Sequence, residues 1–239
     1  EYDAFIEDPY AFCVDIAVPR LYTNLSTQNP YVLSKTIAKA KAAEAKHMGE
    51  LAPTMARISE EKGYYAPPRG SKGHNLAPCD FIADQCRGFS GIVKDMRRNP
   101  QKVKDACDVI YPFVFKTGIP ANISPEGSVS TPLHMPTFIS EKQFVNIWLP
   151  SYKRLLQEYA SLGVRISAFL EDDWRRYYEI VEQEFPCGTM LRLENEDFKL
   201  AKEKLGHKFI LGQSFPLSVV RHGSREQVLD KAKELLEVM

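Results

Sequence analysis

The 239-residue chain has no excess of charge of either sign, because its 31 lysines and arginines balance 31 aspartates and glutamates. Surfaces that bind nucleic acid or anionic membranes are normally rich in positive charge, so we expect neither partner. No run of about 18 apolar residues is present, and we therefore expect no transmembrane helix. A basic segment followed by an apolar one is also missing, which argues against a signal peptide.

The short motifs of several enzyme classes are missing as well. The chain contains no GxGxxG, P-loop or GxSxG sequence, which argues against nucleotide-binding proteins and serine hydrolases. Its five cysteines are odd in number, widely spaced and without a CxxC pair. This pattern favours a reducing, cytoplasmic location and buried thiols over a disulfide framework or a metal site.

The composition that remains is that of a globular protein with one sizeable core. Hydrophobic residues make up 44% of the chain and charged residues 26%, within the usual range. We expect a single domain over residues 1–239, with a long N-terminal helical segment at about 9–62. The pairs Asp8-Pro9 and Asn29-Pro30 are typical helix starts, and Pro53 predicts a kink or break.

The second half of the chain alternates between helices and strands. After a capping box at Ser140, the pattern predicts strands at 164–170, 189–194 and 208–212 with helices between them; a second capping box at Ser224 opens the last helix. Short connections of this kind imply parallel strands with helical crossovers. Earlier strand candidates are residues 64–65 and 121–124, and we interpret 63–78 and 126–137 as loops. About five strands are fewer than the eight of a closed barrel.

Three consecutive acids follow the first of these strands. Glu171, Asp172 and Asp173 come directly after a β-branched run, and parallel-strand enzymes present pocket side chains at such strand ends. Asp173 is expected to cap the helix that begins at Trp174. Glu171 is the better candidate for a general acid or a cation ligand, because burial would raise its pKa. A solvated turn is the alternative.

The next strand also ends in acids. Glu194 and Glu196 follow residues 190–193, and in a barrel Glu194 would approach Glu171 to form a shared acid–base or metal site. In the alternative interpretation, Asn195 or Asp197 caps a helix and both glutamates are exposed.

Basic side chains are candidates for binding a substrate anion. Asp84 and Arg87 are three residues apart and would share a helix face. Arg87, with Arg69, could grip a carboxylate or phosphate, or it could form only a local ion pair. His134, which lies between two prolines, is either a pocket residue or a structural histidine.

Three segments resemble the uroporphyrinogen decarboxylase superfamily: PCDFIADQCRG at 78–88, DMRRNPQKV at 95–103 and GVRISAFLEDDW at 163–174. The resemblance extends from about Tyr2 to Leu236 and implies a TIM-barrel fold, here an incomplete one. It also implies either decarboxylation of a carboxylated tetrapyrrole without a cofactor, or methyl transfer that depends on a cobamide or a metal. The partner would be a small tetrapyrrole or a corrinoid-linked substrate.

Together, the residues and the resemblance predict the site. The expected catalytic residues are Glu171, Asp84 and Glu194. The expected substrate-binding residues are Arg87, His134, Arg69, Asp172 and Trp174.

The chain departs from the family pattern at several positions. The family's functional tyrosine corresponds to Asp84, and the His-x-Cys pair of the zinc methyltransferases corresponds to Phe169 and Glu171, so no metal ligands are expected. The family's arginine-rich segment, its early strand with an essential aspartate and its C-terminal histidine are expected to lie outside this chain. A third interpretation is therefore a fragment that has little activity alone and needs a completing segment or a second copy.

Overall fold

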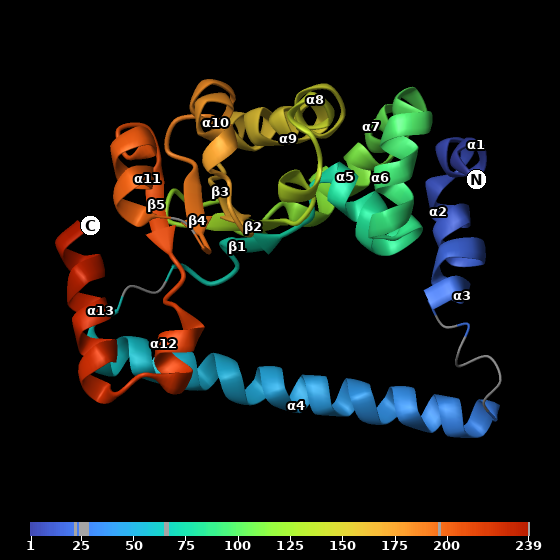
Figure 1. Ribbon diagram of the computed structural model, residues 1–239. Coiled ribbons are helices and arrows are strands. Elements are labelled where there is room, and N and C mark those ends of the chain that lie inside the picture. Colours follow the sequence, from blue (N-terminus) through green and yellow to red (C-terminus); the bar gives the residue numbers. More distant parts are fainter. Residues whose placement is uncertain (22, 24–28, 65–66, 196, 239) are drawn as a thin grey trace.

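The protein has an α/β fold around one parallel sheet (Figure 1). The computed structural model describes residues 1–21, 23, 29–64, 67–195 and 197–238. The strands lie in sequence order, and each pairs in parallel with the next. They are β1 (Lys72–His74), β2 (Ser128–Leu133), β3 (Ile166–Leu170), β4 (Met190–Leu193) and β5 (Ile210–Gln213). Sequential parallel order is the arrangement of a TIM barrel, so the predicted partial-barrel fold is confirmed.

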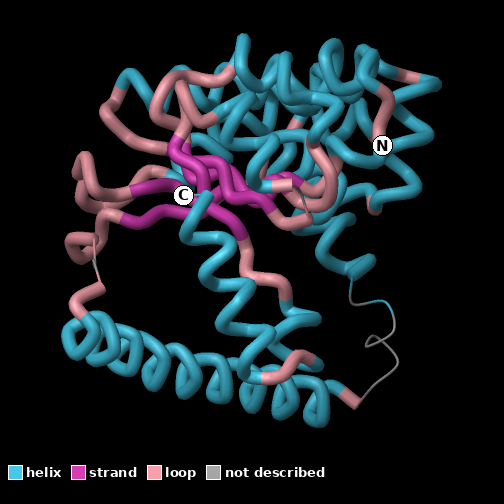
Figure 2. Tube along the Cα trace, turned by 60° about the vertical axis from the view of Figure 1, so that its left-hand side comes forward, coloured by secondary structure: helices cyan, strands magenta, loops and turns pink. Residues whose placement is uncertain are grey.

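A layer of helices covers one face of the sheet (Figures 1 and 2). Each crossover between consecutive strands contributes to this layer, as the alternating sequence pattern predicts. The crossover helices are α5 (Pro78–Phe81), η3 (Ile82–Arg87), α6 (Phe89–Arg98), α7 (Pro100–Gly118), η4 (Pro136–Phe138), α8 (Glu141–Gln143), η5 (Phe144–Trp148), α9 (Leu149–Ser161), η6 (Arg175–Tyr177), α10 (Tyr178–Glu184) and α11 (Phe198–Leu205). After β5 come α12 (Leu217–His222) and α13 (Arg225–Val238).

Local capping signals set several of these helix starts. Ser140 and Gln143 form the expected capping box at α8, and Ser224 and Gln227 form the second one at α13. The Asp197 carboxylate accepts the first backbone N–H groups of α11. These predictions are confirmed. The caps fix the residues at which these helices begin.

The first two strands lie where the sequence predicted loops. β1 falls within 63–78 and β2 within 126–137, whereas the predicted strand at 121–124 is not one. Along β2, buried and half-buried residues alternate, but serine, threonine and Pro132 fill most of its positions. Proline and serine are typical of turns, so they concealed the period of two. Of the candidate strand at 64–65, Tyr65 lies outside the described residues.

The N-terminal segment is helical and divides into two parts. The elements α1 (Tyr2–Glu7), α2 (Pro9–Phe12), η1 (Cys13–Ala17) and α3 (Val18–Leu21) pack beside α6 and α7 (Figure 1). The long helix α4 (Pro30–Lys62) continues through Pro53 without the expected break. It lies on the side of the sheet away from the helical layer, in both views (Figures 1 and 2). No helix of the described residues is long and apolar enough to cross a membrane.

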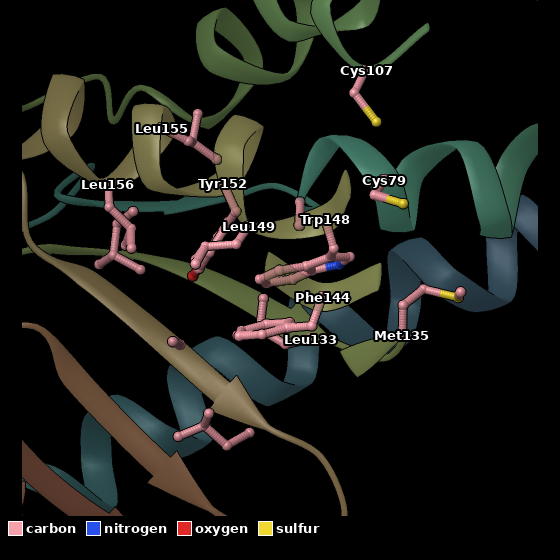
Figure 3. Close-up of a cluster of buried hydrophobic side chains, with 14 of the residues drawn as sticks. Cys79, Cys107, Leu133, Met135, Phe144, Trp148, Leu149, Tyr152, Leu155 and Leu156 are labelled. Atoms are coloured by element: carbon pink, nitrogen blue, oxygen red, sulfur yellow. The ribbon is translucent and has the colours of Figure 1, made fainter. Parts of the chain in front are cut away.

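Aromatic rings fill the space between the sheet and its helices. The ring of Phe144 stacks on Trp148, with centroids 5.3 Å apart, and on Tyr177, with centroids 4.1 Å apart. Figure 3 shows Phe144 and Trp148 lying one above the other, with Tyr152 beside them. The edge of Trp174 meets both Phe144 and Trp148. All of these rings are buried, and they pack beneath the loops that follow β2 and β3.

The close approach of β1 to α7 gives a first testable prediction. A Cβ atom on Gly73 would lie 2.1 Å from the carbonyl oxygen of Gly118, which is backbone and cannot rotate away. We expect Gly73→Ala to lower the free energy of unfolding by about 2 kcal/mol or more. Gly49→Ala is the matched control, because nothing lies within 4 Å of that position in α4 and alanine favours a helix by about 1 kcal/mol. Urea unfolding measures both, and equal effects would show that the close approach does not constrain position 73.

Candidate active site

Three of the predicted residues meet at the carboxyl edge of the sheet. The register pairs Leu133 with Leu170, and Leu170 with Leu193. The residues that follow these strand ends, His134, Glu171 and Glu194, therefore stand in one row. Strand ends thus place an imidazole beside two carboxylates, as parallel-strand enzymes do.

His134 lies between two carboxylates. Its Nδ1 is 2.7 Å from Oε2 of Glu171, and its Nε2 is 3.6 Å from Oδ2 of Asp84 on η3. All three side chains are about one-third exposed, at 34%, 29% and 35%. A ligand at the edge of the sheet can therefore reach a ring that is held from both sides.

The carboxylates determine the charge of the imidazole. Burial favours its neutral form, but the hydrogen bond and charge of Glu171, followed by the charges of Asp84 and Asp80, outweigh burial and raise the pKa of His134. Burial favours the neutral form of Asp84 too, and for a carboxyl group this raises the pKa; the charge of His134 opposes that change. The two carboxylates therefore favour the protonated imidazolium, which can donate a proton, and the carboxyl group of Asp84 beside it can relay one.

We call His134, Glu171 and Asp84 the triad. A fully buried carboxyl group, which sequence reasoning missed, lies behind it. Asp80 on α5 is 0% exposed, and its Oδ1 accepts hydrogen bonds from the Met135 backbone N–H at 3.1 Å and from Trp148 Nε1 at 3.2 Å. Its Oδ2 has no hydrogen-bond partner among the described residues. Burial raises the pKa of Asp80 to about 7, against the lowering effects of Trp148 and His134. Because Met135 follows His134, Asp80 also fixes the loop that carries the imidazole.

The pKa of Asp80 predicts a pH dependence of stability. Between about pH 4 and pH 7 the folded protein holds a proton on Asp80 that the unfolded chain has released, so the free energy of unfolding falls as the pH rises. Asp80→Asn keeps an acceptor for Trp148 and does not titrate. Relative to wild type, we expect this variant to gain about 3–4 kcal/mol across that window and no more above it.

The measurement is urea unfolding at steps between pH 4 and pH 8. Asp15→Asn, at an exposed carboxyl group on η1, is the control and should follow wild type at every pH. If wild type and Asp80→Asn ran parallel, the buried carboxyl group would not titrate in this window.

The loop after β3 is held tightly from both sides. Glu194 Oε2 accepts the backbone N–H of Asp172 at 2.9 Å, and Trp174 Nε1 donates to the Glu171 carbonyl oxygen at 3.0 Å. Asp172 itself is exposed and has a φ of 62°, the left-handed region that aspartate tolerates better than most residues. Asp173 accepts the Arg175 backbone N–H at 3.0 Å, but the helix η6 begins at Arg175 with Trp174 as its N-cap residue, so Asp173 lies one residue before the capping position. Strand alternation therefore does not continue through these acids.

Three predicted substrate-binding residues do not line this site. Arg87 forms a hydrogen-bonded ion pair with Asp95 at 2.6 Å, and not with Asp84, the neighbour that sequence spacing offered. Arg69 precedes β1 and lies at the amino edge of the sheet, opposite the triad. Trp174 is fully buried and supports Glu171 from behind. Sequence spacing alone could not show where these three side chains lie, because their positions depend on how distant segments pack.

One arginine that sequence reasoning overlooked does lie on the side of the acids. Arg192 is exposed and precedes Glu194 by two residues on β4. Its guanidinium group lies 4.7 Å from the ring centroid of Phe169 on β3, on the face of the sheet that the helical layer leaves uncovered. The alternation of β4, with Leu191 and Leu193 buried and Arg192 exposed, is the signal that could have identified it.

A groove of about 430 Å³ opens beside Asp84. The residues that line it come from η1, α3, the end of β1 and the loop after it, α5, η3 and α7, and they include His74, Asn75, Cys13 and Gln85. Among the residues that the structure describes, no group of three or more His, Cys, Asp or Glu side chains is arranged to hold a metal ion. The acids of the triad bind the imidazole instead. The remaining acid, Glu196, lies outside the described residues.

Comparison with family models gives a match over most of the chain. The family model described as uroporphyrinogen decarboxylase (URO-D) matches residues 27–239, which include every strand and the triad. A search of curated proteins finds no significant match.

Proposed function

Because this chain belongs to the uroporphyrinogen decarboxylase family, we propose that it catalyses a decarboxylase-type reaction in which His134 is the proton donor. The contact of this imidazole with Glu171 and Asp84 at the carboxyl edge of the sheet carries the proposal. A histidine whose protonated form is favoured by two carboxylates, and which is partly exposed and fixed in orientation, meets the requirements of a general acid.

The proposed reaction has two steps. A carbon–carbon bond of the substrate breaks, carbon dioxide leaves, and the electron pair stays on the remaining carbon. His134 then donates its proton to that carbon from Nε2. Glu171 accepts the hydrogen bond from Nδ1 at 2.7 Å and so fixes the ring, whereas the contact of Nε2 with Asp84 is longer at 3.6 Å. A proton from solvent restores the imidazolium through Asp84.

Arg192 is the residue that we propose to bind the substrate carboxylate. A guanidinium group matches a carboxylate in two parallel hydrogen bonds, and stacking on Phe169 orients it. The acids of the triad repel a negative charge that lies close to them. When carbon dioxide leaves, the negative charge passes to the remaining carbon, where the proton from His134 neutralises it. We propose a carboxylated pyrrolic compound as the substrate, in keeping with the family.

The test is anaerobic incubation with a uroporphyrinogen in heavy water. We expect carbon dioxide release well above the uncatalysed rate and one deuterium on each carbon that has lost a carboxyl group. Arg192→Gln should raise KM about tenfold or more with a smaller change in kcat. No release of carbon dioxide would refute the proposal. Methyl transfer from methylcobalamin to a thiol would instead support the alternative, a cobamide-dependent methyltransferase.

A further inference from the structure

Two thiols connect the N-terminal helices to the turn that carries Asp84. Cys13 begins η1 and Cys86 lies in η3, 73 residues further along the chain, yet their Sγ atoms are 3.9 Å apart. Both side chains are partly buried. Cys13 also precedes residue 27, where the family match begins. The contact is therefore a feature of this chain that family membership does not account for.

Cys13 lines a wider groove than Cys86 does. Cys13 lines the groove beside Asp84, where a small solute can reach it. Burial, and then the neighbouring Cys13, raise the pKa of Cys86 to about 12. Since the thiolate is the reactive form of cysteine, Cys13 is the residue that meets an oxidant first. Cys86 is placed to react second.

We propose that Cys13 and Cys86 form a reversible disulfide with a low-molecular-weight disulfide, such as oxidised glutathione, as the oxidant. The Cys13 thiolate attacks one sulfur of the oxidant, the oxidant's S–S bond breaks, and one glutathione thiolate leaves. Cys86 then loses its proton to solvent and attacks Cys13 Sγ, which releases the second glutathione. The oxidant takes up two electrons and the protein loses two, so one disulfide is exchanged for another.

The geometry needs only a small movement. Disulfide sulfurs lie about 2 Å apart, and side-chain rotation with a slight shift of the N-terminal helices can close the gap from 3.9 Å. The new bond would hold η1 against η3, and η3 carries Asp84. Oxidation would thus fix η1 and η3 relative to each other on one side of the groove, and it would close a chain loop of 73 residues. We expect Tm to rise by about 5–10 °C on oxidation.

The experiment treats the full chain with oxidised glutathione and maps its cysteines by mass spectrometry of unreduced peptides. We expect a linked pair of peptides containing Cys13 and Cys86. The buried cysteines Cys79 and Cys107, which also neighbour each other, are 0% and 1% exposed and should remain thiols. Exposed Cys187 should carry a glutathione that no second thiol displaces.

Single variants separate the two steps. In Cys86→Ser, Cys13 should keep its glutathione; in Cys13→Ser, Cys86 should remain a thiol and Tm should not change on oxidation. Cys13 and Cys86 both left unmodified in wild type, or each carrying its own glutathione while Cys187 reacts, would overturn the proposal. The wild-type map and its Tm shift decide the matter even if a serine variant fails to fold.

Discussion

Replacing His134 by asparagine is expected to lower kcat for decarboxylation by about 10²–10⁴-fold, the contribution of a positioned general acid. Asparagine fits the same loop and can hydrogen-bond to Glu171, but it has no proton to donate at neutral pH. His74→Asn is the matched control, because His74 ends β1 and does not contact Glu171. A kcat of His134→Asn within threefold of wild type would show that another group donates the proton.

Glu171→Gln tests the origin of the charge on His134. Burial lowers the pKa of His134, and the hydrogen bond and charge of Glu171 are the largest of the influences that raise it, so the variant should lower this pKa. Activity that requires the imidazolium should then decline at a lower pH than in wild type. Histidine signals followed by NMR titration report the same shift without substrate, so this result does not depend on the identity of the substrate.

Trp148→Ala is expected to lower the free energy of unfolding by about 4 kcal/mol or more, a larger loss than that expected of Gly73→Ala. The variant removes a fully buried ring that packs on Phe144, Tyr152 and Trp174. It also removes the Nε1 donor to Asp80, which leaves a buried carboxyl group with one partner fewer. Urea unfolding measures the loss.

Trp148→Phe separates packing from the hydrogen bond. Phenylalanine keeps most of the ring contacts, so we expect a smaller loss of about 1–2 kcal/mol. A loss after Trp148→Ala that is no greater than after Trp148→Phe would mean that the cavity collapses and that ring packing contributes little. Both variants should retain the pairing of His134 with Glu171, which histidine titration can verify.

The second half of the fold could be predicted from sequence because its signals are local. Residues 140–238 carry capping boxes, short connections and apolar strands, and each signal depends on only a few neighbours. The strands β1 and β2 could not be predicted in this way. Their glycine, serine and proline residues are typical of loops, and only the pairing of β1 with β2 and of β2 with β3 makes them strands.

The site shows the same division. Glu171 and Glu194 follow strands of clear pattern, so their position at one edge could be inferred. The partners of His134, Arg87 and Asp80 depend on how η3, α6 and η5 pack, which no short motif encodes. Asp84 was identified through its position in the family, and the structure adds the imidazole beside it. The expectation from sequence that the chain has little activity alone did not consider His134 and Asp84 together as a proton donor.

The π-helical turn η3 determines what the loss of one residue would do to this part of the chain. The backbone N–H of Gly88 donates to the Ala83 carbonyl oxygen, five residues back, at 2.9 Å, so this turn holds one residue more than an α-helical turn. Deleting a single residue, such as Gln85, would convert this turn to regular α-helical winding and leave the residues beyond it on nearly the same side of the helix relative to Asp80, because both turns cover about the same rotation. In a regular α-helix such as α9, the same deletion would rotate the residues beyond it by about 100° and change their partners.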